Sequence, residues 1–226
     1  MRRLTIRRRR ARPAPRALIA AAAVLGGYAL LVRPWHRRWG ATRAETREPL
    51  PGDELPGRTT STRAITIHAP ASEAWRWLVQ IGQDRGGFYS YSAIENGLLR
   101  AGIHNTTEVV PEWQERKRGD FIRGTRPDWM GGRYADKAGW RVADIEPGRY
   151  MVLEGWGTFL LRPLDDRSCR LIVRSHGPAL PWWLAPLDAL LLEPGHFMME
   201  RKMMREIKAL AERSVAREGA VPAISA

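Results

Sequence analysis

Hydrophobic and polar residues follow two different periods at the start of the main body of this chain, and the change of period marks two elements. Residues 63–68 alternate polar and apolar, which is the period of a half-buried strand, and Pro70 ends that strand. Ser72 is placed to cap a following helix. The next apolar residues recur at i, i+3, i+4 and i+7, the pattern of a core-facing helical stripe: Ala74, Trp77, Leu78 and Ile81. A second short helix is predicted over residues 93–100.

From residue 119 onward the pattern changes to short apolar segments separated by tight turns. The segments of strand length are residues 121–123, 140–145, 150–156, 158–164 and 169–176. Residues 146–149 contain a Pro-Gly pair with the chemistry of a type II turn. Because such short turns join antiparallel neighbours, we expect these strands to form a meander.

Apolar residues at helical spacing predict a long C-terminal helix that extends to about Arg213: Phe197, Met199, Met203, Ile207 and Leu210. These elements share one core most economically if a curved antiparallel sheet wraps around the last helix, with two short helices after the first strand. The predicted fold class is therefore α+β. A sheet that grips a helix in this way leaves its concave side incompletely filled, so we expect an apolar cavity there.

The first 47 residues differ in character from the rest of the chain. They contain 13 Arg and one acidic residue, whereas the remaining residues carry a net charge of only +1. A surface that tracks nucleic-acid phosphates needs basic residues clustered on the folded domain, so nucleic-acid binding is not expected.

The Arg residues flank an uncharged run, residues 17–32, which predicts a membrane anchor over residues 17–34. As a helix the run reaches about 24 Å, and snorkelling of the flanking arginines extends it. Eight Arg precede the run and five follow it closely, so the positive-inside rule places the body on the non-cytoplasmic side of a single-pass protein. A cleaved signal segment is the alternative, although no small-x-small cleavage site follows the run closely.

The predicted organisation has five parts. They are an Arg-rich tail (1–16), the anchor or signal segment (17–34), a juxtamembrane linker rich in Pro and Gly toward its end (35–60), one domain (61–217) and a C-terminal tail (218–226). About 157 residues are enough for one domain with a substantial core.

Several short motifs in this order resemble the START-like superfamily, also called SRPBCC, which includes polyketide cyclase-type and birch-pollen-allergen-type proteins. More narrowly, the chain resembles membrane-anchored bacterial members whose function is unknown. The resemblance covers residues 41–213, and the segments that carry it include ITIHAP (65–70), WRWLVQIGQ (75–83), GGFYSY (86–91), EN (95–96), IHN (103–105), VPEWQ (110–114), GD (119–120) and HFMMERKM (196–203). It implies a helix-grip fold with a cavity for hydrophobic ligands, and it does not imply one activity.

Candidate chemistry is sparse. Glu95 and His104 are the nearest approach to an acid–base pair, although both residues are equally suited to bonding backbone groups. No two histidines lie within five residues of each other and no Gly-x-Ser-x-Gly motif is present, so we expect no metal site and no serine nucleophile. Cys169 fits a core position on a strand. No cofactor is predicted.

The function that we predict is membrane-tethered, non-catalytic binding of a hydrophobic small molecule, lipid-like or polyketide-like. The apolar walls would include Trp77, Leu78, Phe88, Met199, Met203 and Ile207, and the polar groups nearest a ligand would be Tyr89, Tyr91 and His104. Tyr89 and Tyr91 also fit a packed loop that seals the core. The alternatives are a cyclase or dehydratase in which His104 or a tyrosine moves protons, and a structural or partner-binding module with a filled core.

An apolar stretch interrupted by prolines, residues 180–192, precedes the last helix and allows two interpretations. It contains an acidic residue and is too short to cross a bilayer. It would either rest in the membrane interface beside the cavity or pack against the body as a lid.

Overall fold

The computed structural model describes residues 15–98, 100–177 and 181–220, and the chain divides into two compact units between His36 and Arg37. The described chain begins with a helical segment: α1 (Pro15–Gly27), the π-helical turn η1 (Tyr28–Val32) and α2 (Arg33–Arg37), whose last residue already belongs to the second unit. Within it, residues Leu18–Arg37 form a helix of 20 residues with a mean hydropathy of 1.6, long and apolar enough to cross a membrane, and its side chains are largely exposed. A signal sequence meets the same criteria.

The second unit contains one six-stranded antiparallel sheet among the described residues, with strand order β1-β6-β5-β4-β3-β2. Its strands are β1 (Arg58–Ile67), β2 (Phe121–Arg123), β3 (Gly139–Glu146), β4 (Tyr150–Leu153), β5 (Gly157–Asp165) and β6 (Ser168–Gly177). The helices are α3 (Ala71–Val79), η2 (Ala93–Leu98), η3 (Pro111–Trp113), η4 (Trp129–Gly132), η5 (Trp182–Leu184), α4 (Ala185–Leu187), η6 (Asp188–Leu192) and α5 (Glu193–Ala220).

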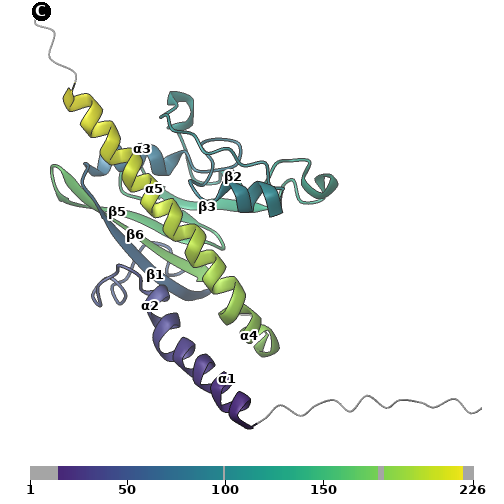
Figure 1. Cartoon of the computed structure of the whole chain (residues 1–226). Coiled ribbons are helices and arrows are strands. Elements are labelled where there is room, and N and C mark those ends of the chain that lie inside the picture. The colour runs from purple at the N-terminus through teal and green to yellow at the C-terminus, as the bar shows by residue number, and fades with distance from the viewer. Residues whose placement is uncertain (1–14, 99, 178–180, 221–226) are drawn as a thin grey trace, which may run out of the picture. The chain divides into compact units, whose positions relative to one another are not determined.

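The long helix α5 crosses one face of this sheet (Figure 1). The α+β class and the meander from β3 to β6 are therefore confirmed, and the fold is helix-grip-like.

The type II turn between β3 and β4 is also confirmed, because Gly148 has φ +80° and Arg149 N–H donates to Glu146 O over 3.0 Å. The pairing of β1 with β6, which are a hundred residues apart, had no signal in the local pattern.

The core lies between α5 and the inner face of the sheet. Alternate residues of the strands point toward the helix and are fully buried there: Ile67, Met151, Phe159, Leu171 and Val173. They meet the buried stripe of α5, which includes Met203, Met204, Ile207 and Leu210. The predicted stripe of the first helix is confirmed, since Ala74, Trp77, Leu78 and Ile81 are buried in the same cluster. Burial of each large side chain contributes about 1.5–3 kcal/mol.

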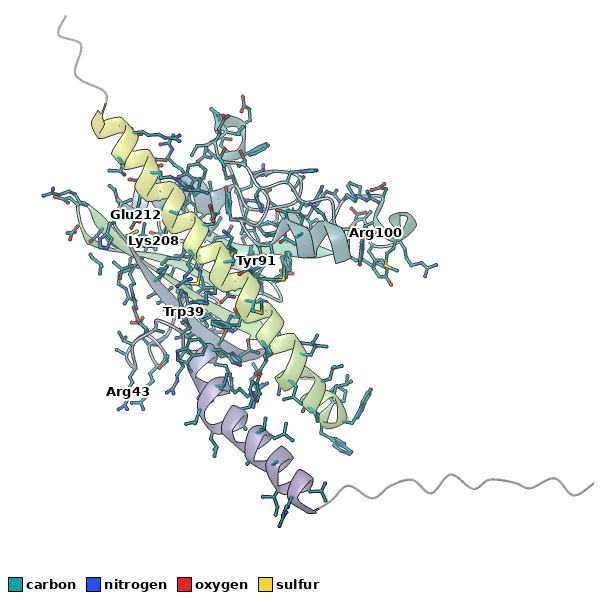
Figure 2. All side chains as sticks on the ribbon, in the orientation of Figure 1. Trp39, Arg43, Tyr91, Arg100, Lys208 and Glu212 are labelled. Atoms are coloured by element: carbon teal, nitrogen blue, oxygen red, sulfur yellow. The ribbon has the colours of Figure 1, made fainter. Side chains whose placement is uncertain are left out.

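Two polar contacts fix the C-terminal half of α5 to the end of β1. Lys208 Nζ donates to Thr66 O over 2.8 Å, and the carboxylate of Glu212 accepts a bond from the backbone N–H of His68 over 2.7 Å. Lys208 and Glu212 also pair with each other on consecutive turns of the helix (Figure 2). The helix is thus held in register against the strand at this end.

The outer face of the sheet is covered by residues 40–57, all of which lie within the segment that the sequence predicts to be a linker (35–60). Their chain has no regular helix or strand, yet it packs on the sheet, and Leu50 is buried with Ala64, Leu160 and Ile172. These residues belong to the same compact unit as the sheet.

Two arginines of β6 tie this covering segment to the outer face. Arg170 donates to both carboxylate oxygens of Glu45, from Nε to Oε1 over 2.7 Å and from Nη2 to Oε2 over 3.0 Å. Arg174 is 4 % exposed and donates to Asp53 Oδ2 over 2.5 Å and to the carbonyls of Glu45 and Glu48, each over 2.8 Å. Burial opposes ionisation of Glu45, but Arg170 and Thr42 outweigh it and lower the pKa of that carboxyl to about 2.

Two local predictions need correction. The first helix begins after Pro70, and the Ser72 side chain makes no capping bond because Ser72 already lies inside the first turn. The second helix is a π-helical turn, Ala93–Leu98, and not an α-helix to residue 100, because Arg100 adopts a positive φ of 52° that breaks the helical path.

Replacing Arg174 by Met is expected to lower the free energy of unfolding by about 3 kcal/mol, because the change leaves Asp53 and two carbonyls of the covering segment without their buried donor. Chemical unfolding of the detergent-solubilised chain measures the loss. The control is Arg149→Ala, which removes an exposed pair with Glu146 and should change stability by less than about 0.5 kcal/mol. Equal effects of the two variants would contradict the role given to the covering segment.

Candidate functional site

A partly enclosed cavity of about 470 Å³ lies between the N-terminal half of α5 and the inner face of the sheet. Met199 and Met203 line it from α5, Ser61 and Arg63 from β1, and Trp140 from β3. The core side chains described above fill the other half of the same interface. The predicted hollow beside the last helix is thus present, and its walls are mostly apolar.

Aromatic rings make up one wall of the cavity. Phe88 packs edge-on against Trp140 with ring centroids 5.6 Å apart, and Trp156 lies 4.5 Å from Trp140 and 5.9 Å from Phe88. Trp129, on the turn η4, also lines the cavity. Such rings offer both apolar surface and the negative electrostatic faces that attract cations.

A buried ion pair forms the polar part of the wall where β1 faces α5. Arg63 Nη1 donates to Glu200 Oε1 over 2.7 Å, and the two side chains are 2 % and 0 % exposed. The second carboxylate oxygen accepts a bond from Ser175 Oγ over 2.7 Å and lies 2.9 Å from His196 Nε2. The Arg63 guanidinium also stacks over the ring of Phe197, 5.1 Å from its centroid.

The surroundings of Glu200 keep it ionised. Burial opposes its charge, but the charges of Arg63 and His196 and the bonds from His196 and Ser175 outweigh burial, so the pKa of the carboxyl falls well below its ordinary range. A buried pair with its remaining lone pairs satisfied is the arrangement that a low-dielectric site tolerates.

Glu95 is the opposite case. It lines the cavity from the turn η2, it is 1 % exposed, and neither of its carboxyl oxygens has a hydrogen-bond partner. The hydroxyls of Ser61 and Ser90, which also line the cavity, are buried without a partner as well. Burial raises the pKa of the Glu95 carboxyl, because no neighbour stabilises its charged form.

Of the residues that we predicted for the site, Phe88, Met199 and Met203 line the cavity, and so does the weak catalytic candidate Glu95. Whether they bind a ligand remains a prediction. Trp77, Leu78 and Ile207 are buried in the filled part of the core and do not line the cavity.

The predicted polar ligand groups lie elsewhere. Tyr89 is 1 % exposed, its hydroxyl accepts a bond from Gln80 Nε2 over 2.7 Å, and it packs on Trp77 with ring centroids 6.3 Å apart. Tyr91 is 40 % exposed and His104 is exposed, and neither lines the cavity.

The loop that holds Tyr89 depends on the preceding glycines. Gly87 has φ +76°, and a Cβ there would lie 2.5 Å from Asn105 Oδ1, which accepts the backbone N–H of Tyr89.

The pairing of Glu95 with His104 does not form. The Glu95 oxygens have no partner, whereas His104 is exposed. Cys169 is fully buried, and burial raises the pKa of its thiol to about 11, so it stays a protonated core residue at neutral pH. In the part of the chain that the structure describes, no group of three His, Cys, Asp or Glu side chains could hold a metal ion.

Sequence reasoning missed the Arg63–Glu200 pair, although signals for it exist. Arg63 shares the inward phase of β1 with Ile65 and Ile67, so a charged side chain in that phase needs a buried partner. His196 and Glu200 are four residues apart on one helix and therefore face the same side. Neither signal says that the two elements meet, because that depends on the long-range packing of β1 and α5.

The apolar stretch before α5 is exposed over its described residues, 181–192, and these residues do not pack against the body as a lid. Its large apolar side chains point to solvent: Trp182 at 86 %, Trp183 at 62 %, Leu187 at 48 %, Leu190 at 51 %, Leu191 at 62 % and Leu192 at 50 %. Leu192 and the neighbouring Asp188 also line the cavity. A contiguous apolar surface of this kind is typical of an interaction site.

Comparison with known proteins gives little. No family model matches the chain, and no curated protein matches it. Among solved structures, the solution structure of the self-sacrificing resistance protein CalC from Micromonospora echinospora is similar, with 12 % identity and a TM-score of 0.39, and the match covers 71 % of this chain and 96 % of that one. A match with this identity and TM-score does not establish a relationship, and the fold is assigned from the order of the strands and the packing of α5 on the sheet.

Two substitutions on α5 separate the hollow from the filled core. Met199→Trp should change the free energy of unfolding by less than about 1 kcal/mol, because the larger ring enters the cavity, whereas Ile207→Trp should destabilise by about 1–3 kcal/mol through overpacking. Chemical unfolding of both variants measures the difference. A large loss for Met199→Trp together with a small one for Ile207→Trp would contradict the assignment.

Proposed function

We propose that this protein binds a hydrophobic small molecule, lipid-like or polyketide-like, in the cavity beside α5, without covalent chemistry. The observation that carries the proposal is the 470 Å³ space with mostly apolar walls and a few buried polar groups. Ligand sites in proteins commonly have this size and composition. The resemblance to START-like proteins, which share a cavity for hydrophobic ligands, supports the same interpretation.

The two alternatives receive less support. A cyclase-type mechanism would use His104 or a tyrosine to move protons, and neither His104, Tyr89 nor Tyr91 lines the cavity. A binding module with a filled core is at odds with the space between the sheet and the N-terminal half of α5. We therefore retain binding as the function.

We further propose that the chain is tethered to a membrane through residues 18–37, with the body on the non-cytoplasmic side. The length and composition of this helix support the proposal, as does the larger number of Arg residues on its N-terminal side.

The exposed segment Trp182–Leu192 would then rest in the membrane interface. Trp side chains favour the headgroup region, and the leucines supply an apolar surface that water does not favour. Because Leu192 lines the cavity, contact between this segment and lipid would place the opening of the cavity against the bilayer. A hydrophobic ligand could then enter without crossing water.

The binding proposal predicts that a hydrophobic molecule co-purifies with the full chain in mild detergent. Native mass spectrometry should detect its added mass on the wild-type protein. Met199→Trp fills part of the cavity, so the share of ligand-bound protein should fall at least about tenfold. The exposed substitution Leu164→Ala serves as the control and should leave the share unchanged. Wild-type protein that never carries added mass, and that takes up no added lipid, would contradict the proposal.

The interface proposal predicts that the exposed tryptophans contact acyl chains. Brominated acyl chains quench the fluorescence of tryptophans that touch them, and Trp182 and Trp183 are two of the ten tryptophans of the chain. In bilayers of brominated lipid, the part of the fluorescence that is quenched should therefore be smaller for the double variant Trp182→Phe, Trp183→Phe than for the wild-type chain. Phenylalanine keeps the apolar character of the surface. The control is Trp113→Phe, which lies on η3 and does not line the cavity, and it should lose none of the quenched part. Identical quenching in wild type and the double variant would mean that the segment does not touch lipid.

A further inference from the structure

The least compensated group in the cavity is the carboxyl of Glu95. Both of its oxygens are buried and neither accepts or donates a hydrogen bond within the described residues. Burial of a carboxyl without a partner costs several kcal/mol, so such groups are uncommon in folded proteins and commonly mark a function. Glu95 also lies on the π-helical turn η2, a distortion that is frequent at functional sites.

The other fully buried carboxyl of the cavity, that of Glu200, is already compensated. Glu200 has Arg63, Ser175 and His196 as partners, so a ligand gains nothing by replacing them. The hydroxyls of Ser61 and Ser90 also lack a partner. The unsatisfied polar groups that line the cavity therefore include Glu95, Ser61 and Ser90.

The charges and rings around the cavity favour a cation. The described residues that line it include four carboxyl groups, two arginines and two histidines: Glu95, Asp188, Glu193, Glu200, Arg37, Arg63, His176 and His196. Arg63 and His196 both contact Glu200, and His176 lies 3.4 Å from Asp53, so these three side chains do not compensate Glu95. The aromatic wall of Phe88, Trp140 and Trp156 adds ring faces that attract an ammonium group through cation–π interactions.

We infer that the cavity selects hydrophobic ligands that carry a protonated amine, with the Glu95 carboxylate accepting hydrogen bonds from the ammonium group. The apolar part of the ligand would lie along Met199 and Met203 and against the aromatic wall. The inference rests on the proposed ligand-binding function and specifies the class of ligand. An ammonium group next to Glu95 would supply the opposite charge that its site lacks.

A matched pair of probes tests the selection. The full chain in nanodiscs of zwitterionic lipid is dialysed against 2-naphthylmethylamine or 2-naphthylmethanol, which share their ring system and differ in the ammonium and hydroxyl groups. Empty nanodiscs supply the blank for partition into lipid. The wild-type chain should bind the amine about tenfold more tightly than the alcohol, as expected for a hydrogen-bonded charge pair of modest strength.

Two variants assign the preference to one residue. Glu95→Gln keeps the shape of the side chain and removes its charge, so it should abolish the preference for the amine. Asp188→Asn removes another carboxylate of the cavity and should leave most of the preference in place. Circular dichroism and chemical unfolding, compared with the wild-type chain, show that each variant is folded.

The possible outcomes separate the inference from the function on which it rests. Equal binding of amine and alcohol by the wild-type chain overturns the inference and leaves the binding function standing. Loss of the preference in Asp188→Asn but not in Glu95→Gln also overturns it. If neither probe binds, and no other hydrophobic molecule does, the proposed function itself fails.

Discussion

The buried pair of Arg63 and Glu200 is the constraint on which the site depends. Two charges taken out of water must stay together, because separating them would leave each uncompensated at a cost of about 3–5 kcal/mol. The pair fixes the N-terminal half of α5 opposite β1, while Lys208 and Glu212 fix the C-terminal half. The helix is thus attached to the β1 side of the sheet at two points, and the first of them, Glu200, is itself part of the cavity wall.

Local sequence patterns predicted most of the elements, the antiparallel meander and the packing of the sheet on the last helix, but not the contacts between segments that are distant in sequence. The strand at residues 121–123 matches β2 residue for residue, because its turns and period are local. The packing of residues 40–57 on the outer face depends on Arg170 and Arg174 meeting partners more than a hundred residues away, which no local period encodes. Likewise Met199 and Ile207 look equivalent on the helix, yet one lines the cavity and the other fills the core. Long-range packing against the sheet decides between them, and local sequence spacing does not encode that packing.

The arrangement joins three features that hydrophobic-ligand binding requires. The filled half of the core supplies stability, the hollow half supplies space, and the exposed segment from Trp182 to Leu192 supplies an apolar surface at the edge of that space. The unpaired carboxyl of Glu95 adds a means of discrimination, since an apolar cavity alone distinguishes poorly between molecules of similar size. Binding and selection are thus assigned to different residues of one wall.

Xenon binding tests the central claim most directly, because this atom enters apolar cavities and has no affinity for a packed core. Methyl resonances of the methionines report its position when the full chain is pressurised with the gas. We predict saturable shifts at Met199 and Met203, which line the cavity, and much smaller ones at Met151, which is buried in the filled core. Shifts that are absent at Met199 and Met203, or equal at all three residues, would contradict the account.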